Sequence, residues 1–132
     1  MATKFITTHL DVRGLLTAVD LTQLPFEPKR LFTITGASPG IIRGRHAHKQ
    51  CRQLLIVVHG IVCVNITKIV KGELQHGCFN LKAGQHIDIL PGVWSEQEFV
   101  TKGAVLLVCC DRAYEKHDYI SDFSEFLAEL NY

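Results

Sequence analysis

The stretch GIIRGRHAHKQCRQLLIVVHG, residues 40–60, decides the fold of this chain. Its composition favours short strands, and the glycines within it let the backbone bend. In a strand, side chains two residues apart point to the same face, so His46 and His48 face the same way. Arg43 and Arg45 place positive charge beside them. Two histidines on one concave face predict either a metal site or a proton-transfer site.

Short strand-like segments recur on both sides of this stretch, separated by turns rich in Gly and Pro. We expect strands at residues 5–12, 15–20, 30–35, 53–59, 61–70, 79–82, 86–90, 98–101 and 104–110. Many short strands with little helix before residue 120 predict a β-sandwich or barrel.

Only the end of the chain has a helical pattern. In SDFSEFLAEL, residues 121–130, the apolar side chains of Phe123, Phe126, Leu127 and Leu130 recur at the spacing of one helix face. Ser121 or Asp122 can cap this helix. We expect the helix to lay an apolar stripe on the outside of the β-body, as packing rather than chemistry.

The bulk composition bounds the function. The chain has 132 residues, 47% hydrophobic and 20% charged, with a net charge of +1. It has no basic tail or stripe, which argues against nucleic acid as a partner. No apolar run is long enough to span a membrane, and the N-terminus lacks a signal-peptide layout. Five cysteines without CxxC spacing indicate reduced thiols, so we expect a soluble, cytoplasmic protein.

The spacing within residues 40–60 is specific. From Gly40 there are five residues to His46, one to His48, four to Gln53 and six to Gly60. This resembles the first motif of the cupin superfamily, with Gln53 where the family has glutamate. The resemblance implies an all-β cupin jelly-roll barrel with a short C-terminal helix, and a single cupin domain over residues 1–132.

The second cupin motif normally brings another histidine after a Pro-Gly turn. Here the matching segment is PGVWSE, residues 91–96, and it has no histidine. His46 and His48, with neutral Gln53 and Ser95, fall short of the three protein ligands that zinc and iron sites use. We therefore expect no metal, and proton transfer instead, because imidazole titrates near neutral pH. Buried histidines that only pack the barrel are the structural alternative.

A closer resemblance covers nearly the whole chain, from Asp11 to about Tyr119. RGRHAHK, preceded by DVRG and PKRLF and followed by PGVWSE and HDYI, resembles the nucleotide-sugar 3,4-ketoisomerases. This family of small cupins acts without metal or other cofactor on dTDP-4-keto-6-deoxyglucose. The resemblance implies isomerisation through an enediol to a dTDP-3-keto-6-deoxyhexose, in amino-deoxysugar biosynthesis for surface polysaccharides such as O-antigen.

Matched to the family residue by residue, His48 would be the base at C3 and His46 the partner that relays or returns protons. The substrate-binding residues that the match implies or leaves open are Arg13, Arg43, Phe32, Gln53, Trp94 and Ser95. Phe32 and Ser95 depart from the family, which commonly has tyrosine and histidine there. Trp94 is a candidate to stack on the thymine base, or else a core or rim aromatic.

Three other residues carry weaker expectations. Arg30 is either a phosphate contact or a solvated charge, and Asp118 and Tyr119 are expected only to cap and pack the helix. The resemblance also implies a homodimer, with the N-terminal strand exchanged between subunits. Two other functions stay open: a metal-dependent cupin enzyme, such as a dioxygenase or sugar isomerase, and a non-catalytic sugar-nucleotide-binding cupin. The configuration at C4 of the product, gluco or galacto, is also open.

Overall fold

A computed structural model describes residues 5–130 of the chain. The strands are β1 (Ile6–Asp11), β2 (Gly14–Val19), β3 (Arg30–Ile34), β4 (Ile42–His48), β5 (Gln53–His59), β6 (Ile61–Val70), β7 (Glu73–Lys82), β8 (His86–Ile89), β9 (Trp94–Phe99), β10 (Val105–Cys110) and β11 (Tyr119–Ile120). The helices are α1 (Phe123–Glu129) and two short 3₁₀ turns, at Leu21–Gln23 and Lys116–Asp118. The expected all-β fold with a short C-terminal helix is confirmed.

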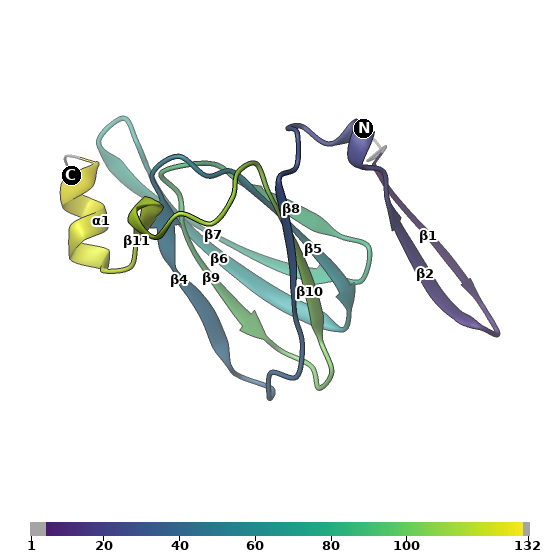
Figure 1. Cartoon of the computed structure of the whole chain (residues 1–132). Helices are drawn as coiled ribbons and strands as arrows, with labels where there is room; N and C mark the ends of the chain where they lie inside the picture. The colour runs from purple at the N-terminus through teal and green to yellow at the C-terminus, as the bar shows by residue number, and fades with distance from the viewer. Residues whose placement is uncertain (1–4, 131–132) are drawn as a thin grey trace.

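Two antiparallel sheets face each other to form the barrel (Figure 1). One has the strand order β3-β10-β5-β8 and the other β11-β4-β9-β6-β7. Inward side chains of both sheets form one apolar core, because alternate residues of each strand point to the same face. Its fully buried members include Val57, Val62, Val64, Phe99 and Leu106. Cys109 and Cys110 are buried, as the sequence predicted. All five cysteines are free thiols in this structure.

Two strands begin earlier than the sequence predicted, and the short strand β11 was missed. β7 begins at Glu73 instead of residue 79, because the strand pairs with β6 along its whole length, from Val70↔Glu73 to Ile61↔Lys82. β9 runs from Trp94 instead of residue 98, because it lies between β4 and β6 and is held from both sides. Both segments are polar, and sheet pairing overrides their low strand propensity.

Helix α1 packs as its sequence pattern predicts. The side chain of Asp122 accepts a hydrogen bond from the backbone N–H of Glu125, which caps the helix. Phe126 is fully buried beside Trp94, with ring centroids 5.5 Å apart. No helix among residues 5–130 combines the length and the apolar character that a membrane crossing requires.

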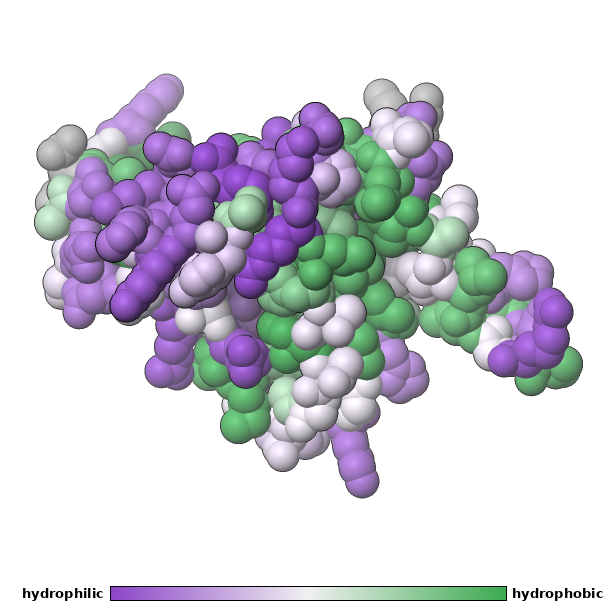
Figure 2. All heavy atoms as spheres, viewed as in Figure 1, coloured by the Kyte–Doolittle hydropathy of each residue, from purple (hydrophilic) through white to green (hydrophobic). Residues whose placement is uncertain are grey.

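The hairpin β1–β2 stands off from the barrel (Figure 1). Near its base, Ile6 packs against Leu54 and Ile56 of the barrel. Beyond this point the hairpin exposes a run of large apolar side chains: Leu10, Val12, Leu15 and Leu16. Figure 2 shows apolar residues on this hairpin and on the adjoining face of the barrel.

Candidate active site

A cavity of about 360 Å³ opens between the two sheets. Its walls mix aromatic, cationic and amide side chains with apolar ones. The lining residues are Arg30, Phe32, Ile34, Arg43, Gly44, His46, Gln53, Leu55, Gln97, Val108 and Tyr119. They come from strands β3, β4, β5, β9, β10 and β11, so the interior of the barrel assembles the site.

The backbone of β4 bends where it enters the cavity. Gly44 and Arg45 have positive φ values of 85° and 58°, and the register with β9 shifts between Gly44 and His46. Such a bulge re-aims the side chains that follow it. The ring of His46 then lies on the cavity wall, with its Nδ1 3.1 Å from the carbonyl oxygen of Gly44. A carbonyl only accepts, so Nδ1 carries the proton and Nε2 is left as the basic nitrogen.

His48 lies deeper in the barrel and is held by Asp118. Its Nδ1 donates a hydrogen bond of 2.9 Å to Oδ2 of this carboxylate, and both side chains are buried. Asp118 also accepts hydrogen bonds from the backbone N–H groups of Gln50, at 2.7 Å, and Cys51, at 3.2 Å. Nε2 of His48 is therefore unprotonated, and within residues 5–130 it is buried without a hydrogen-bond partner.

Burial controls the charge of both imidazoles. It lowers the pKa of His46 below its ordinary value, and the charge of His48 lowers it further. It also lowers the pKa of His48, although the hydrogen bond to Asp118 works in the opposite direction. Burial alone would raise the pKa of Asp118, but the hydrogen bonds from His48 and two backbone N–H groups bring it below the usual value. Neutral imidazoles beside a carboxylate are suited to accepting protons.

Tyr119 and Arg30 complete the wall beside the histidines. The ring of Tyr119 lies 5.0 Å from that of His46 and 4.4 Å from that of His48, between centroids. The guanidinium of Arg30 lies over the ring of Phe32, and contact with the Tyr119 phenol raises the pKa of Arg30. From the sequence, Tyr119 was expected only to cap and pack the helix; its position on the cavity wall was not predicted.

The structure brings four of the residues expected from the sequence to the cavity: Phe32, Arg43, His46 and Gln53. The amide of Gln53 also donates a hydrogen bond to Sγ of Cys110, at 3.4 Å. His48 is adjacent to the cavity but does not line it, because the rings of His46 and Tyr119 pack against it.

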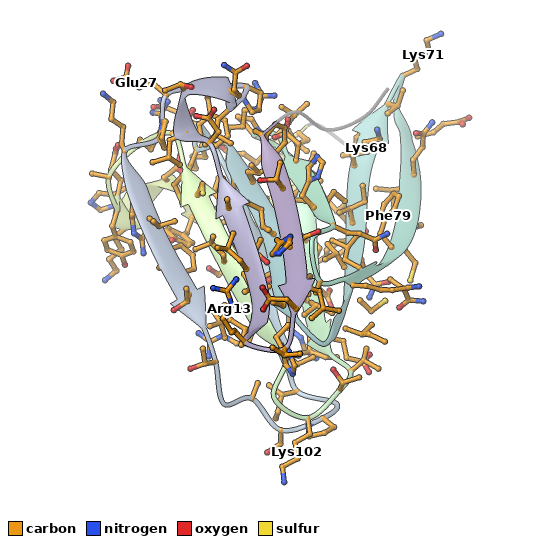
Figure 3. All side chains as sticks on the ribbon, turned by 90° about the vertical axis from the view of Figure 1, so that its right-hand side faces the viewer. Arg13, Glu27, Lys68, Lys71, Phe79 and Lys102 are labelled. Carbon is orange, nitrogen blue, oxygen red and sulfur yellow. The ribbon has the colours of Figure 1, made fainter. Side chains whose placement is uncertain are left out.

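Three other expected residues lie elsewhere. Ser95 is buried behind the wall, where its hydroxyl accepts a hydrogen bond from the Gln97 amide at 3.0 Å. Trp94 packs under helix α1 on the outside of the barrel, so the thymine-stacking role does not fit its position. Strand alternation is the reason: Trp94 and Ser95 are neighbours and must face opposite ways. Arg13 is exposed on the β1–β2 hairpin and pairs with Asp11 (Figure 3).

Among residues 5–130, one group of side chains is close enough together to bind a metal ion. It consists of His48, Cys51 and Asp118, whose ligand atoms lie within 4.8 Å of one another. The donor set does not suit a cation. The carboxylate of Asp118 already accepts three hydrogen bonds. Burial raises the pKa of Cys51 to about 12, so its thiol resists conversion to the thiolate that binds metal. His46 is not part of this group.

Sequence reasoning missed Asp118 and Gln97 as site residues. Asp118 is 70 residues from His48, so no local spacing connects them. Gln97 was detectable, because it lies two residues after Ser95 and thus on the same face of β9.

Comparisons with known proteins agree with this architecture. Residues 1–131 match the model of the family described as WxcM-like, C-terminal (FdtA). The TDP-4-oxo-6-deoxy-alpha-D-glucose-3,4-oxoisomerase of Aneurinibacillus thermoaerophilus is 28% identical over 92% of this chain and 88% of its own length.

Two solved structures are similar over almost the whole chain. The first is a histidine-to-asparagine mutant of the 3,4-ketoisomerase QdtA from Thermoanaerobacterium thermosaccharolyticum, in complex with TDP-4-keto-6-deoxyglucose. It has a TM-score of 0.81 and 31% identity, covering 94% of this chain and 88% of the other. The second is a 3,4-ketoisomerase from Helicobacter canadensis, with a TM-score of 0.80 and 32% identity, covering 96% and 93%. This chain therefore belongs to the WxcM-like, C-terminal family (FdtA).

Proposed function

We propose that this protein is a sugar-nucleotide 3,4-ketoisomerase that converts dTDP-4-keto-6-deoxyglucose into a dTDP-3-keto-6-deoxyhexose, for amino-deoxysugar biosynthesis. The observation that carries the proposal is the His48–Asp118 pair beside a cavity lined by His46, Arg30 and Arg43. Family membership supports it, since relatives with this name or this ligand match nearly the whole chain.

The reaction is redox-neutral and needs only proton transfers. A base removes the proton from C3, and the electron pair of the C3–H bond forms a C3–C4 double bond while the C4 oxygen gains charge. The hydroxyl proton at C3 then passes to the charged C4 oxygen while a proton is delivered to C4, which leaves a ketone at C3 and a hydroxyl at C4. Such chemistry requires a base that is neutral near pH 7 and a cation near the developing oxyanion.

His48 is the proposed base at C3, and His46 is its partner. The Asp118 carboxylate holds His48 in the tautomer with a free lone pair on Nε2 and stabilises the imidazolium that forms. Because Nε2 is buried, the adjacent rings must shift when substrate enters, as catalytic contacts often tighten only in the complex. His46 already lines the cavity, so it is the second candidate for the base.

Arg43 and Arg30 are the proposed cations of the site. Both line the cavity, where a guanidinium can bind a diphosphate or stabilise an enolate oxygen. Phe32 and Gln53 would contact the sugar from the β3 and β5 walls, and Ser95 would act through Gln97. The protein would work without a metal or other cofactor.

We also propose a homodimer in which the β1–β2 hairpin packs on the partner subunit. The support is the run of exposed apolar side chains on this hairpin, which a second copy would cover (Figure 2). Arg13 would then serve the partner's site. Neither nucleic acid nor a membrane is a proposed partner, and the five free thiols fit the cytoplasm as its location.

Exchange of the hairpin has a direct test. If Arg13 serves the partner's site, Arg13→Ala and His48→Asn are each inactive as homodimers. Mixed and re-equilibrated in equal amounts, they should regain about one quarter of the wild-type activity, because half of the dimers then carry one intact site. Arg13→Ala with full activity, or no recovery on mixing, would contradict the exchange.

The function itself is tested by proton NMR in D₂O, with dTDP-4-keto-6-deoxyglucose and chelator-treated protein. New 3-keto product with deuterium at C4, lost in His48→Asn, supports a metal-free ketoisomerase with His48 as base. If product formation were lost in His46→Asn but not in His48→Asn, His46 would be the base instead. Activity that appears only after a divalent metal is added would support a metal-dependent cupin. Binding without proton exchange would support a non-catalytic cupin.

A further inference from the structure

Tyr119 lies on the cavity wall beside both histidines. It pairs with His48 across the β11–β4 register, so both side chains enter the barrel side by side. Its ring contacts both histidines, and it is part of the cavity wall. Asp118, the preceding residue, holds His48, so one short segment supplies two groups of the site.

Few side chains on the cavity wall can donate a proton, and the phenol of Tyr119 is one of them. Of the eleven lining residues, only His46 and Tyr119 have side chains that exchange a proton within the range open to general acid catalysis. Phe32, on the opposite sheet, has a ring but no hydroxyl. The amides of Gln53 and Gln97 donate hydrogen bonds but do not give up a proton at neutral pH.

Arg30 provides the charge that such an acid requires. Its guanidinium lies 4.8 Å from the ring centroid of Phe32 and 5.2 Å from that of Tyr114. Contact with the Tyr119 phenol raises the pKa of Arg30. A guanidinium next to a phenol oxygen stabilises the negative charge that this oxygen gains when it donates its proton.

We propose that Tyr119 is the general acid that returns the proton to C4, with Arg30 stabilising the phenolate. The inference rests on the proposed ketoisomerase function and deepens it. In this step the O–H bond of Tyr119 breaks and the C4–H bond forms from the electron pair of the enediolate. The phenolate regains a proton from the imidazolium of His48, which carries the proton taken from C3. The two rings are 4.4 Å apart between centroids, and Nε2 of His48 reaches the phenol oxygen only after the same shift of the rings that admits substrate. All groups then return to their starting states.

The decisive variant is Tyr119→Phe, which keeps the ring against both histidines and removes only the hydroxyl. In D₂O, product formation should fall by about 10²- to 10⁴-fold. Deuterium should still enter C3 of the recovered substrate, because His48 continues to form the enediol. Arg30→Gln should show the same separation of exchange from product formation.

Tyr114→Phe is the matched control. Tyr114 also contacts Arg30, with its ring 5.6 Å from that of Tyr119, but it does not line the cavity. This variant should keep wild-type rates of exchange and isomerisation. Circular dichroism and thermal unfolding of all three variants confirm that each one folds.

The outcomes separate this inference from the proposed function. A wild-type protein that yields neither exchange nor product overturns the function, and the inference falls with it. If the wild type isomerises and Tyr119→Phe isomerises equally well, the inference alone is wrong. In Tyr119→Phe, the rate of deuterium exchange at C3 and the rate of product formation could instead fall by the same factor. That result would make Tyr119 a positioning residue for His48 and would also overturn the proposed acid role.

Discussion

Nδ1 of His48 lies 2.9 Å from Oδ2 of Asp118, a residue 70 positions later in the chain. His48 is the last residue of β4, and Asp118 ends the 3₁₀ turn just before β11, which pairs with β4 at the edge of the five-stranded sheet. The carboxylate selects one tautomer of the imidazole and leaves Nε2 unprotonated. The chemistry of the histidine stretch therefore depends on a segment next to the C-terminal helix.

Replacing Asp118 tests this dependence. In Asp118→Asn the amide can donate to Nδ1 of His48, which moves the ring proton to Nε2 and removes the basic lone pair. We expect turnover to fall on the order of 10²- to 10⁴-fold, by analogy with the aspartate of serine-protease triads. The measurement is kcat for 3-keto product formation.

Asp122→Asn is the control for that change. It lies four residues further on and caps helix α1, a position where asparagine works as well as aspartate. We expect its activity and its stability to stay close to wild type. Wild-type turnover in Asp118→Asn would refute the role assigned to the carboxylate.

The pH dependence follows from the lowered pKa of His48. The ordinary value is 6.5, and burial lowers it in the folded protein. The neutral form of His48 therefore predominates at pH 6.5, and if His48 is the base, the acidic limb of kcat/KM should lie below that pH. A limb centred above pH 7 would contradict the assignment.

Stability should change in the same pH range. Between pH 6.5 and the lowered pKa, the unfolded chain binds more protons at this histidine than the folded chain does, so stability falls as pH drops through this range. The pKa of His46 is also lowered, so His46 contributes a pH dependence of stability in the same direction. Urea unfolding of wild type and His48→Asn between pH 5 and pH 7.5 measures this contribution, which should shrink in the variant.

Close packing and a positive φ leave room only for glycine at position 44. A Cβ at this position would lie 2.6 Å from Oε1 of Gln97 and 3.0 Å from the carbonyl oxygen of Ser95, on a backbone with φ of 85°. We expect Gly44→Ala to displace Gln97 from the cavity wall, with a loss of both activity and about 1–3 kcal/mol of stability.

Gly40→Ala separates the two effects. Its φ of 93° imposes similar backbone strain, but a Cβ there would meet nothing within 4 Å. This variant should lose roughly 1–2 kcal/mol of stability and keep its activity. If both alanine variants have equal activity, the packing of Gly44 against Gln97 does not matter for the site.

Helix α1 supports the site from outside. Phe126 is fully buried between this helix and the barrel, whereas Phe123 is 39% exposed. We expect Phe126→Ala to cost about 3–5 kcal/mol of unfolding free energy and Phe123→Ala clearly less. Turnover of Phe126→Ala should fall as well, because the helix contacts β11 and β4, which carry Tyr119 and His48. Denaturant unfolding and activity assays at one temperature compare the two variants.

The sequence by itself determined the fold class, the paired histidines and the apolar stripe of the last helix. These are periodic signals: residues two apart share a strand face, and residues three or four apart share a helix face. The same alternation correctly groups His46 with His48. It also shows that Trp94 and Ser95 cannot both face the cavity, which the expectation for Trp94 overlooked.

The tertiary structure decided which side chains complete the site. Asp118 and Tyr119 reach the histidines only because β11 pairs with β4, and Arg30 does so because β3, in the other sheet, lines the same cavity; no local spacing encodes these contacts. It also set the extent of β7 and β9, whose polar sequences are strands because neighbouring strands satisfy their backbone groups. Local patterns specify which face a side chain occupies, whereas contacts between distant segments arise only when the whole core is buried.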